Sequence, residues 1–267
     1  MGDLRLGVIG FGNMAGAIIK SALHNNVFSL SEITVFDIDP QKMLFAREIG
    51  VNTASTHGEA VINSDIILLA VKPQIIETVL SEIKNVSEGR CFVSIAAGIS
   101  GDYIKSLLSP KAYVLRVMPN TPIMVGRGAT AVAKSDDVPY EYYKKAVSIF
   151  SSSGEVAFID ESRMNEIISV NSSSPAYFFL MVDAMVKSAE EQGIDKAVAL
   201  RLSAKAMEGA AAMLLESGKS PEELASQVTS PGGTTFAALK ALSDNRFQET
   251  VRKAMHSCTK RAYELGK

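Results

Sequence analysis

Short apolar runs alternate with amphipathic stretches over the first part of the chain. The apolar runs are too short for ordinary helices and favour buried strands, whereas a helix fits the pattern around 140–150. Strands alternating with helices predict an α/β fold built on a parallel, doubly wound sheet. The predicted strands are 4–9, 33–36, 66–71, 91–95 and 113–117, with late edge strands at 128–133 and 155–158.

The pattern changes after Asp160, where strands give way to helical runs. A first helical stretch over 164–170 is interrupted by the polar segment 171–175, and Gly193 and Gly218 stand where helices should stop. Further helical runs cover 175–192, 195–216, 234–243 and 245–265. The run 197–215 is apolar on more than one face and needs cover, which a second subunit supplies in a homodimer.

The segment that follows the first strand carries a nucleotide-binding pattern, Gly10-Phe11-Gly12-Asn13-Met14-Ala15-Gly16, and then a helix. Gly10 permits the tight turn, Gly12 admits the pyrophosphate, and Ala15 lets the helix pack closely on the strand. We therefore expect a dinucleotide-binding Rossmann domain over 1–160 and a helical substrate-binding and dimerisation domain over 161–267.

The second strand ends at Asp37. An acid there accepts from the ribose 2′-hydroxyl of NAD and repels the 2′-phosphate of NADP, with Lys42 nearby as a compensating cation. The alternative is that Asp37 caps the helix that starts at Pro40. Two later strands end in segments that contain Lys72-Pro73 and Ala96-Ala97, at the edge where open α/β sheets bind ligands.

A glycine turn, Ser230-Pro231-Gly232-Gly233-Thr234-Thr235, precedes a helix in the second part. Free backbone N–H groups at the start of a helix bind small anions such as a carboxylate. The alternative is an ordinary capped helix after a turn. A nicotinamide fold with this inventory favours reduction of an imine over that of a ketone, since a protonated imine needs no strong general acid.

Composition narrows the partners. The net charge is −2 without a block of like charge, which argues against nucleic acid and anionic membranes. No apolar run reaches transmembrane length, and the start of the chain does not resemble a signal peptide. The two cysteines indicate a cytoplasmic protein without a disulfide framework, and three histidines give no basis for a metal cluster.

Taken in order, these motifs resemble the pyrroline-5-carboxylate reductase family along essentially the whole chain. The segments that carry the resemblance are Gly10 to Met14, Ala70-Val71-Lys72-Pro73, Ala96-Ala97-Gly98, Met118-Pro119-Asn120-Thr121-Pro122, Ser174-Pro175-Ala176-Tyr177 and Ser230 to Thr235. The last of them is the most diagnostic.

The resemblance implies reduction of 1-pyrroline-5-carboxylate to L-proline by hydride transfer from NADP(H) or NAD(H), the last step of proline biosynthesis. It implies dimers that assemble further, commonly into decamers of five dimers. The implied substrate contacts are Ser230, Gly233 and Thr234 for the carboxylate and Thr235 for the imine nitrogen, as catalytic residue. The implied cofactor contacts are Gly10, Phe11, Gly12, Asn13, Met14, Ala70, Val71, Lys72, Pro73, Ala96 and Ala97.

The chain departs from the family pattern at two places. Ser172-Ser173-Ser174 stands where Gly-Ser-Gly is common, and His57 stands where Asn is common. Two other classes remain open: a related imine reductase or β-hydroxyacid dehydrogenase, and a non-catalytic dinucleotide-binding regulator. Lys72 is the rival proton donor to Thr235. Cofactor preference, assembly beyond the dimer and regulation by proline are left open by the sequence.

Overall fold

The structure, a computed structural model, describes residues 4–266 and divides them into two compact units. Unit 1 holds residues 4–175 and 257–266, and unit 2 holds 176–256. The chain therefore leaves unit 1 after Pro175 and returns to it at Ser257.

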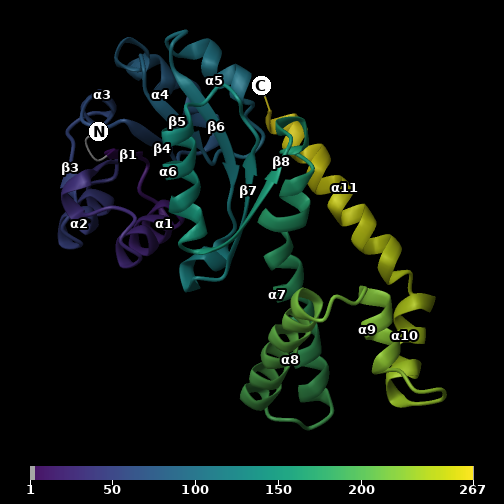
Figure 1. The fold of residues 1–267 in the computed structure, drawn as a ribbon. Helices are drawn as coiled ribbons and strands as arrows, with labels where there is room; N and C mark the ends of the chain where they lie inside the picture. The colour runs from purple at the N-terminus through teal and green to yellow at the C-terminus, as the bar shows by residue number, and fades with distance from the viewer. Residues whose placement is uncertain (1–3, 267) are drawn as a thin grey trace. The chain divides into compact units, whose positions relative to one another are not determined.

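Unit 1 is built on an 8-stranded sheet in the order β3-β2-β1-β4-β5-β6-β7-β8 (Figure 1). Parallel pairing runs from β3 through β6, as the alternating pattern predicts. The α/β fold class is thus confirmed. The strands are β1 (Leu6–Ile9), β2 (Ile33–Phe36), β3 (Asn52–Thr53), β4 (Ile66–Leu69), β5 (Cys91–Ser94), β6 (Tyr113–Met118), β7 (Gly128–Ala133) and β8 (Gly154–Ile159).

One strand contradicts the expectation of a wholly parallel sheet. β7 pairs antiparallel with β6, and β8 then pairs parallel with β7. The cause is the short connection from Met118 to Gly128, which contains only the turn η4 (Thr121–Val125). A parallel neighbour needs a crossover of about a dozen residues or more, usually a helix.

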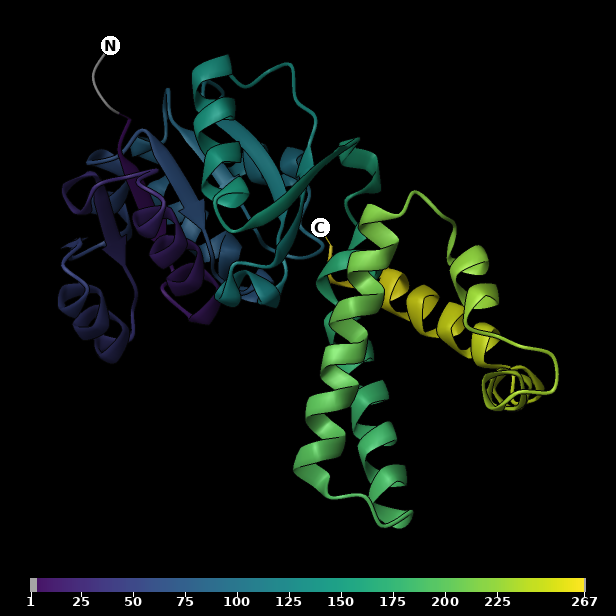
Figure 2. The same cartoon turned by 60° about the horizontal axis from the view of Figure 1, so that its bottom comes forward.

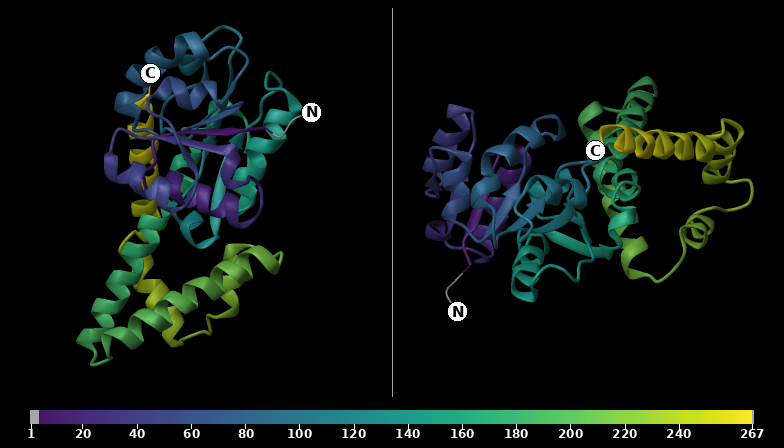
Figure 3. Two further views of the ribbon diagram at one scale, coloured as in Figure 1. Left: turned by 90° about the vertical axis from the view of Figure 1, so that its left-hand side faces the viewer. Right: turned by 90° about the horizontal axis from the view of Figure 1, so that it is seen from above.

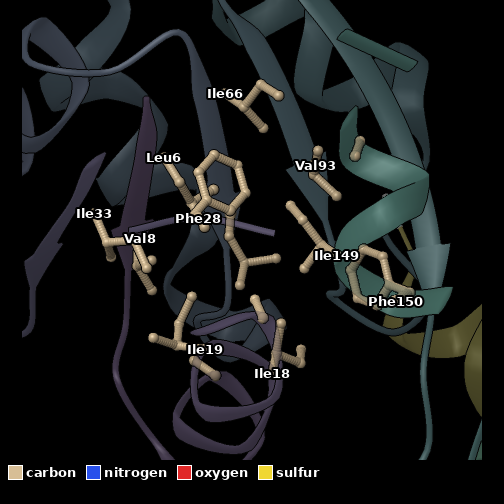
Figure 4. Close-up of a cluster of buried hydrophobic side chains, with 14 of the residues drawn as sticks. Leu6, Val8, Ile18, Ile19, Phe28, Ile33, Ile66, Val93, Ile149 and Phe150 are labelled. Carbon is tan, nitrogen blue, oxygen red and sulfur yellow. The ribbon is translucent and has the colours of Figure 1, made fainter. Parts of the chain in front are cut away.

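Helices cover both faces of this sheet (Figure 3). On one face, α1 (Asn13–His24), α2 (Pro40–Glu48) and α6 (Tyr140–Ser151) pack on the strands. Figure 4 shows Ile18 and Ile19 of α1 and Ile149 and Phe150 of α6 gathered in this core. The other face carries α3 (His57–Ile62), α4 (Ile76–Ile83) and α5 (Gly101–Leu107).

The two cores follow from the alternation of side chains along each strand. In β1, Leu6 and Val8 lie in the first core and Ile9 in the second. Each such side chain stabilises the fold by about 1.5–3 kcal/mol when fully buried. Cys91 of β5 also belongs to the core, and burial raises the pKa of its thiol to about 12. The thiol therefore stays protonated and does not act as a nucleophile.

Short turns complete unit 1. Four of them are the 3-10 turns η1 (Leu30–Glu32), η2 (Pro73–Ile75), η3 (Lys84–Val86) and η5 (Glu161–Arg163), and η6 (Ile168–Ser172) is a π-helical turn. The expected interruption at 171–175 is wrong in detail. Asn171 and Ser172 belong to η6, and Ser174 already begins the next helix, where proline in the first turn is tolerated because its missing N–H would have no partner.

Unit 2 is helical throughout, as the second part of the sequence predicts. Its helices are α7 (Ser174–Glu191), α8 (Lys196–Glu216), α9 (Pro221–Gln227), α10 (Thr234–Asp244) and α11 (Phe247–Leu265), with the start of α7 and the end of α11 in unit 1. α7 and α8 run side by side as a hairpin (Figure 2).

The helices of unit 2 bury few side chains within one chain. Val182, Val186 and Ala199 form a small cluster between α7 and α8. Other large apolar side chains on these helices face outward, among them Leu180, 71% exposed, and Leu202, 61% exposed. Exposed apolar surface of this extent is typical of sites that bind another molecule. Within residues 4–266, no helix is both long enough and apolar enough to span a membrane.

Candidate functional site

The turn between β1 and α1 contains two glycines, Gly10 and Gly12, which are required for different physical reasons. Gly10 has φ +87°, and a Cβ there would lie 2.7 Å from the carbonyl oxygen of Ala70. Only glycine satisfies both conditions. Gly12 has an ordinary φ of −72°, and a Cβ there would meet nothing within 4 Å. The backbone at Gly12 therefore borders open space, as a close approach by a phosphate requires.

The N-terminus of α1 opens onto that space. Gly12 is its N-cap residue and no side chain caps the first turn. A cavity of about 830 Å³ runs alongside, bordered by Gly12 from the turn, by Asn13 and Lys20 of α1 and by Lys42 of α2. The uncapped N–H groups, the positive end of the helix dipole and the lysines all favour an anion. The pyrophosphate of a dinucleotide fits this chemistry.

Asp37 lies at the carboxyl end of β2, and its carboxylate is held by backbone. One oxygen accepts from the N–H of Phe11 at 2.6 Å and the other from the N–H of Asp39 at 2.9 Å. The helix-capping role falls to Asp39 instead, which accepts from the N–H of Gln41 at 2.9 Å. Asp37 therefore connects the glycine turn to the end of β2, beside the expected ribose position.

The other expected cofactor segments lie along the same edge of the sheet. Ala70 to Pro73 follow β4, and Ala96-Ala97 follow β5, both parallel neighbours in line with β1. Lys72 is exposed and takes part in no ion pair within residues 4–266. The cofactor residues expected from the sequence therefore stand in the segments that follow β1, β2, β4 and β5, which are parallel neighbours and end at one edge of the sheet: Gly10, Phe11, Gly12, Asn13, Met14, Asp37, Ala70, Val71, Lys72, Pro73, Ala96 and Ala97.

His57, which stands where the family commonly has Asn, begins α3 next to this edge. Its ring packs edge-on against Phe36, with the ring centres 4.7 Å apart. Its Nδ1 lies 2.7 Å from a carboxylate oxygen of Glu82. The carboxylate orients the ring, so His57 is held in place by two neighbours before any ligand arrives.

In unit 2, the turn from Ser230 to Thr235 joins α9 to α10. Gly232 has φ +71°, and the N–H of Gly233 donates to the carbonyl of Ser230 at 3.0 Å. Gly233 is the N-cap residue of α10, again without a side-chain cap. The hydroxyls of Ser230, Thr234 and Thr235 have no hydrogen-bond partner within residues 4–266. Free N–H groups and three free hydroxyls in one turn have the chemistry that suits a small anion such as a carboxylate.

The sequence did not predict a role in the site for the residues that follow β6, among them Asn120. Asn120 is only 6% exposed, and its Oδ1 accepts from the N–H of Ala129 at 2.9 Å. A polar side chain inside the Met118 to Pro122 segment was the available signal. Among residues 4–266, no His, Cys, Asp and Glu side chains gather in a group that could hold a metal ion.

Comparison with known proteins decides the family. A family model described as pyrroline-5-carboxylate reductase dimerisation matches residues 161–265. The pyrroline-5-carboxylate reductase of Escherichia coli is 36% identical over 99% of each chain. The chain belongs to the pyrroline-5-carboxylate reductase family.

Further matches cover both parts of the chain. A model described as NADP oxidoreductase, coenzyme F420-dependent, matches residues 5–98. The solved pyrroline-5-carboxylate reductase of Coxiella burnetii is 33% identical, with a TM-score of 0.90 and full coverage of both chains. The Plasmodium falciparum reductase, solved with NADP bound, is 25% identical, with a TM-score of 0.91 and full coverage of both chains.

Proposed function

We propose that this protein reduces 1-pyrroline-5-carboxylate to L-proline, with NADP(H) as the hydride source and NAD(H) as an alternative. Both parts of the chain support the proposal. The turn after β1 suits a dinucleotide pyrophosphate, and the turn before α10 suits a small carboxylate. The full-length similarity to pyrroline-5-carboxylate reductases joins the two observations in one activity.

The nucleotide half of the site is formed by unit 1. When bound, the reduced nicotinamide supplies a hydride to the carbon of the C=N bond. The first turn of α1 receives the pyrophosphate, and Gly12 leaves room for it. Asp37 borders the ribose with a carboxylate whose charge is partly offset by the N–H groups of Phe11 and Asp39. The segments Ala70 to Pro73 and Ala96-Ala97 line the remaining edge.

The substrate half is formed by the turn before α10. The Ser230 hydroxyl and the N–H of Thr234 at the start of α10 bind the carboxylate, and Gly233, whose own N–H donates to the Ser230 carbonyl, shapes the turn beside it. The Thr235 hydroxyl donates toward or accepts from the imine nitrogen. When the C=N carbon receives its hydride, the nitrogen of a protonated imine becomes an amine and needs no further strong acid. Thr235 therefore orients the imine nitrogen and does not itself need to give up a proton.

The observation that carries the proposal is the uncapped glycine turn of unit 2. Ser230, Thr234 and Thr235 leave their hydroxyls free in one turn, an arrangement that a nucleotide-binding regulator has no need for. The test is to mix purified protein, pyrroline-5-carboxylate and NADPH, and to follow absorbance at the nicotinamide band. A non-catalytic regulator gives no decay. A β-hydroxyacid dehydrogenase gives decay with the matching oxo-acid but none with the cyclic imine.

We further propose a homodimer formed through unit 2, because its helices expose large apolar side chains in a single chain. The match to a family model for dimerisation over 161–265 supports this arrangement. A decamer of five dimers is the larger assembly that the family resemblance implies. A cytoplasmic location agrees with two cysteines that are both free.

A further inference from the structure

The chain just past β6 occupies the second half of the nucleotide-binding fold. In the strand order of unit 1, β1 to β3 form one mononucleotide-binding half and β4 to β6 form the other. The first half carries the glycine turn, so the second half receives the nicotinamide end. Met118 is the last residue of β6, and Pro119 and Asn120 follow it. Their backbone lies at the carboxyl edge of the sheet, where the nicotinamide of a bound cofactor would transfer its hydride.

The side-chain amide of Asn171, in the π-helical turn η6, forms hydrogen bonds to backbone at this edge. Its Nδ2 donates to the carbonyl of Met118 at 2.7 Å and to that of Ala129 at 3.0 Å. Two carbonyl acceptors settle which end of the amide is nitrogen. The Oδ1 atom is enclosed and has no hydrogen-bond partner within residues 4–266. An enclosed polar group retained at the cost of one unsatisfied acceptor points to a role beyond packing.

Two further side chains complete the same connection. Asn120 donates from Nδ2 to the carbonyl of Asn171 at 3.1 Å, and Ser172 donates from Oγ to the carbonyl of Pro119 at 2.8 Å. We call Asn120, Asn171 and Ser172 the β6 clasp. Ser172 stands where the family commonly has glycine, yet its φ is not positive. Glycine's conformational freedom is therefore not used here, and the serine adds a bond that glycine lacks.

The clasp lies where the chain passes between its two units. Ser173 follows it directly, and the Sγ of Cys258 donates to the Ser173 hydroxyl at 3.2 Å. The chain leaves unit 1 after Pro175 and re-enters it at Ser257, so the bond from Cys258 joins the returning chain to the residue next to the clasp within unit 1. π-helical turns occur frequently at functional sites.

We propose that Asn171 and Ser172 are positioning residues for hydride transfer, acting through the carbonyl groups of Met118 and Pro119 at the nicotinamide end of the cofactor site. This inference rests on the proposed reductase activity. Hydride transfer depends steeply on donor–acceptor geometry, and a shift on the order of 1 Å costs about a hundredfold in rate. Loss of the clasp loosens the surface that fixes the nicotinamide ring, while the proposed carboxylate site in unit 2 stays intact.

The test compares Asn171→Ala and Ser172→Ala with Ser172→Thr, which keeps the hydroxyl, and with Ser174→Ala. Ser174, the first residue of α7, is the neighbouring control, because its Oγ makes only one long bond, 3.4 Å to the carbonyl of Asn171, and does not contact Met118 or Pro119. Four quantities are measured on the full-length enzyme: kcat, KM for pyrroline-5-carboxylate, the isotope effect with 4-deuterated NADPH, and the emission of bound NADPH. Thermal midpoints show whether each variant is folded.

The clasp predicts a kcat about tenfold lower for Asn171→Ala, with KM nearly unchanged, a larger isotope effect and altered NADPH emission. Ser172→Ala loses about threefold, the effect of one hydrogen bond, and Ser172→Thr recovers most of that loss. Ser174→Ala behaves as the parent enzyme.

Folded Ser172→Ala protein with parental kcat and parental NADPH emission would overturn the inference, even if Asn171→Ala failed to fold. A fall in activity that follows the thermal midpoint while emission and isotope effect stay constant would overturn it as well. If the parent enzyme binds NADPH but does not reduce the imine, the proposed function fails. The emission of bound NADPH still tests the clasp in that case.

Discussion

At the scale of single residues, Thr235 separates substrate positioning from simple binding. Its hydroxyl has no partner within the described chain, and it stands in the first turn of α10, whose N–H groups are also free. A hydroxyl that contacts the reacting nitrogen interacts more strongly in the transition state than in the ground state. Its loss therefore lowers kcat as well as kcat/KM.

We predict that Thr235→Ala lowers kcat on the order of a hundredfold, the low end of acid–base contributions, and leaves NADPH affinity nearly unchanged. Thr234→Ala, the matched control, loses much less because its expected contact is through backbone, which alanine retains. Steady-state kinetics on both variants provide the measurement. Equal losses, or a Thr235→Ala enzyme within a few-fold of the parent, would transfer the role to Lys72 or to water.

Asp37 decides between the two nicotinamide cofactors at the same scale. In the proposed site its carboxylate faces the ribose and repels a 2′-phosphate, while the N–H groups of Phe11 and Asp39 partly offset its charge. We predict turnover with both NADPH and NADH, and a rise in kcat/KM for NADPH relative to NADH in Asp37→Ser. The ratio of the two kcat/KM values is the readout, and an unchanged ratio would show that Asp37 does not face the ribose.

At the scale of elements, the turn from β1 to α1 allows stability and binding to be separated. A Cβ at Gly10 collides with the Ala70 carbonyl on the neighbouring chain segment, whereas a Cβ at Gly12 enters open space. We predict that Gly10→Ala loses about 1–3 kcal/mol of unfolding free energy from backbone strain alone.

The paired variant Gly12→Ala should keep the stability of the parent and bind NADPH at least about tenfold more weakly, since its methyl group occupies the space left for phosphate. Chemical denaturation and NADPH titration on both proteins measure the two effects. Tight NADPH binding by folded Gly12→Ala protein would show that the pyrophosphate does not bind at this turn.

The sequence predicts elements well where a local pattern determines them. The apolar runs of β1, β2, β4, β5 and β6 and the long helices α7 and α8 appear as expected. It predicts poorly where tertiary contacts decide. The direction of β7 depends on the length of one connection, and Asn171 of η6 bonds to carbonyls of β6 and β7, which lie far from it in the sequence. No local pattern carries such information.

The same limit applies to the candidate site. The glycine turns are recognisable because their residue types are required by backbone geometry and close approach. The bond from Phe11 to Asp37 and the clasp around Asn120 join residues far apart in sequence. Their polar residue types are visible in the sequence, but their partners are not.

At the scale of the whole molecule, the exposed apolar surface of unit 2 predicts obligate association. Leu180 and Leu202 are more than half exposed in one chain. Both lie within residues 161–265, which match the family model described as pyrroline-5-carboxylate reductase dimerisation. Burial of such side chains contributes about 1.5–3 kcal/mol each. We predict no folded monomer at micromolar concentration. Sedimentation that shows a stable, folded species of 28.6 kDa would contradict this.

In the proposed reaction, a hydride passes from the nicotinamide to the C=N carbon of pyrroline-5-carboxylate. The most direct measurement uses NADPH deuterated at the transferred position of C4, with mass spectrometry of the product. We predict L-proline that carries one deuterium at the former imine carbon, in equal amount to the NADPH consumed. Proline without deuterium, or NADPH oxidation without proline, would contradict it.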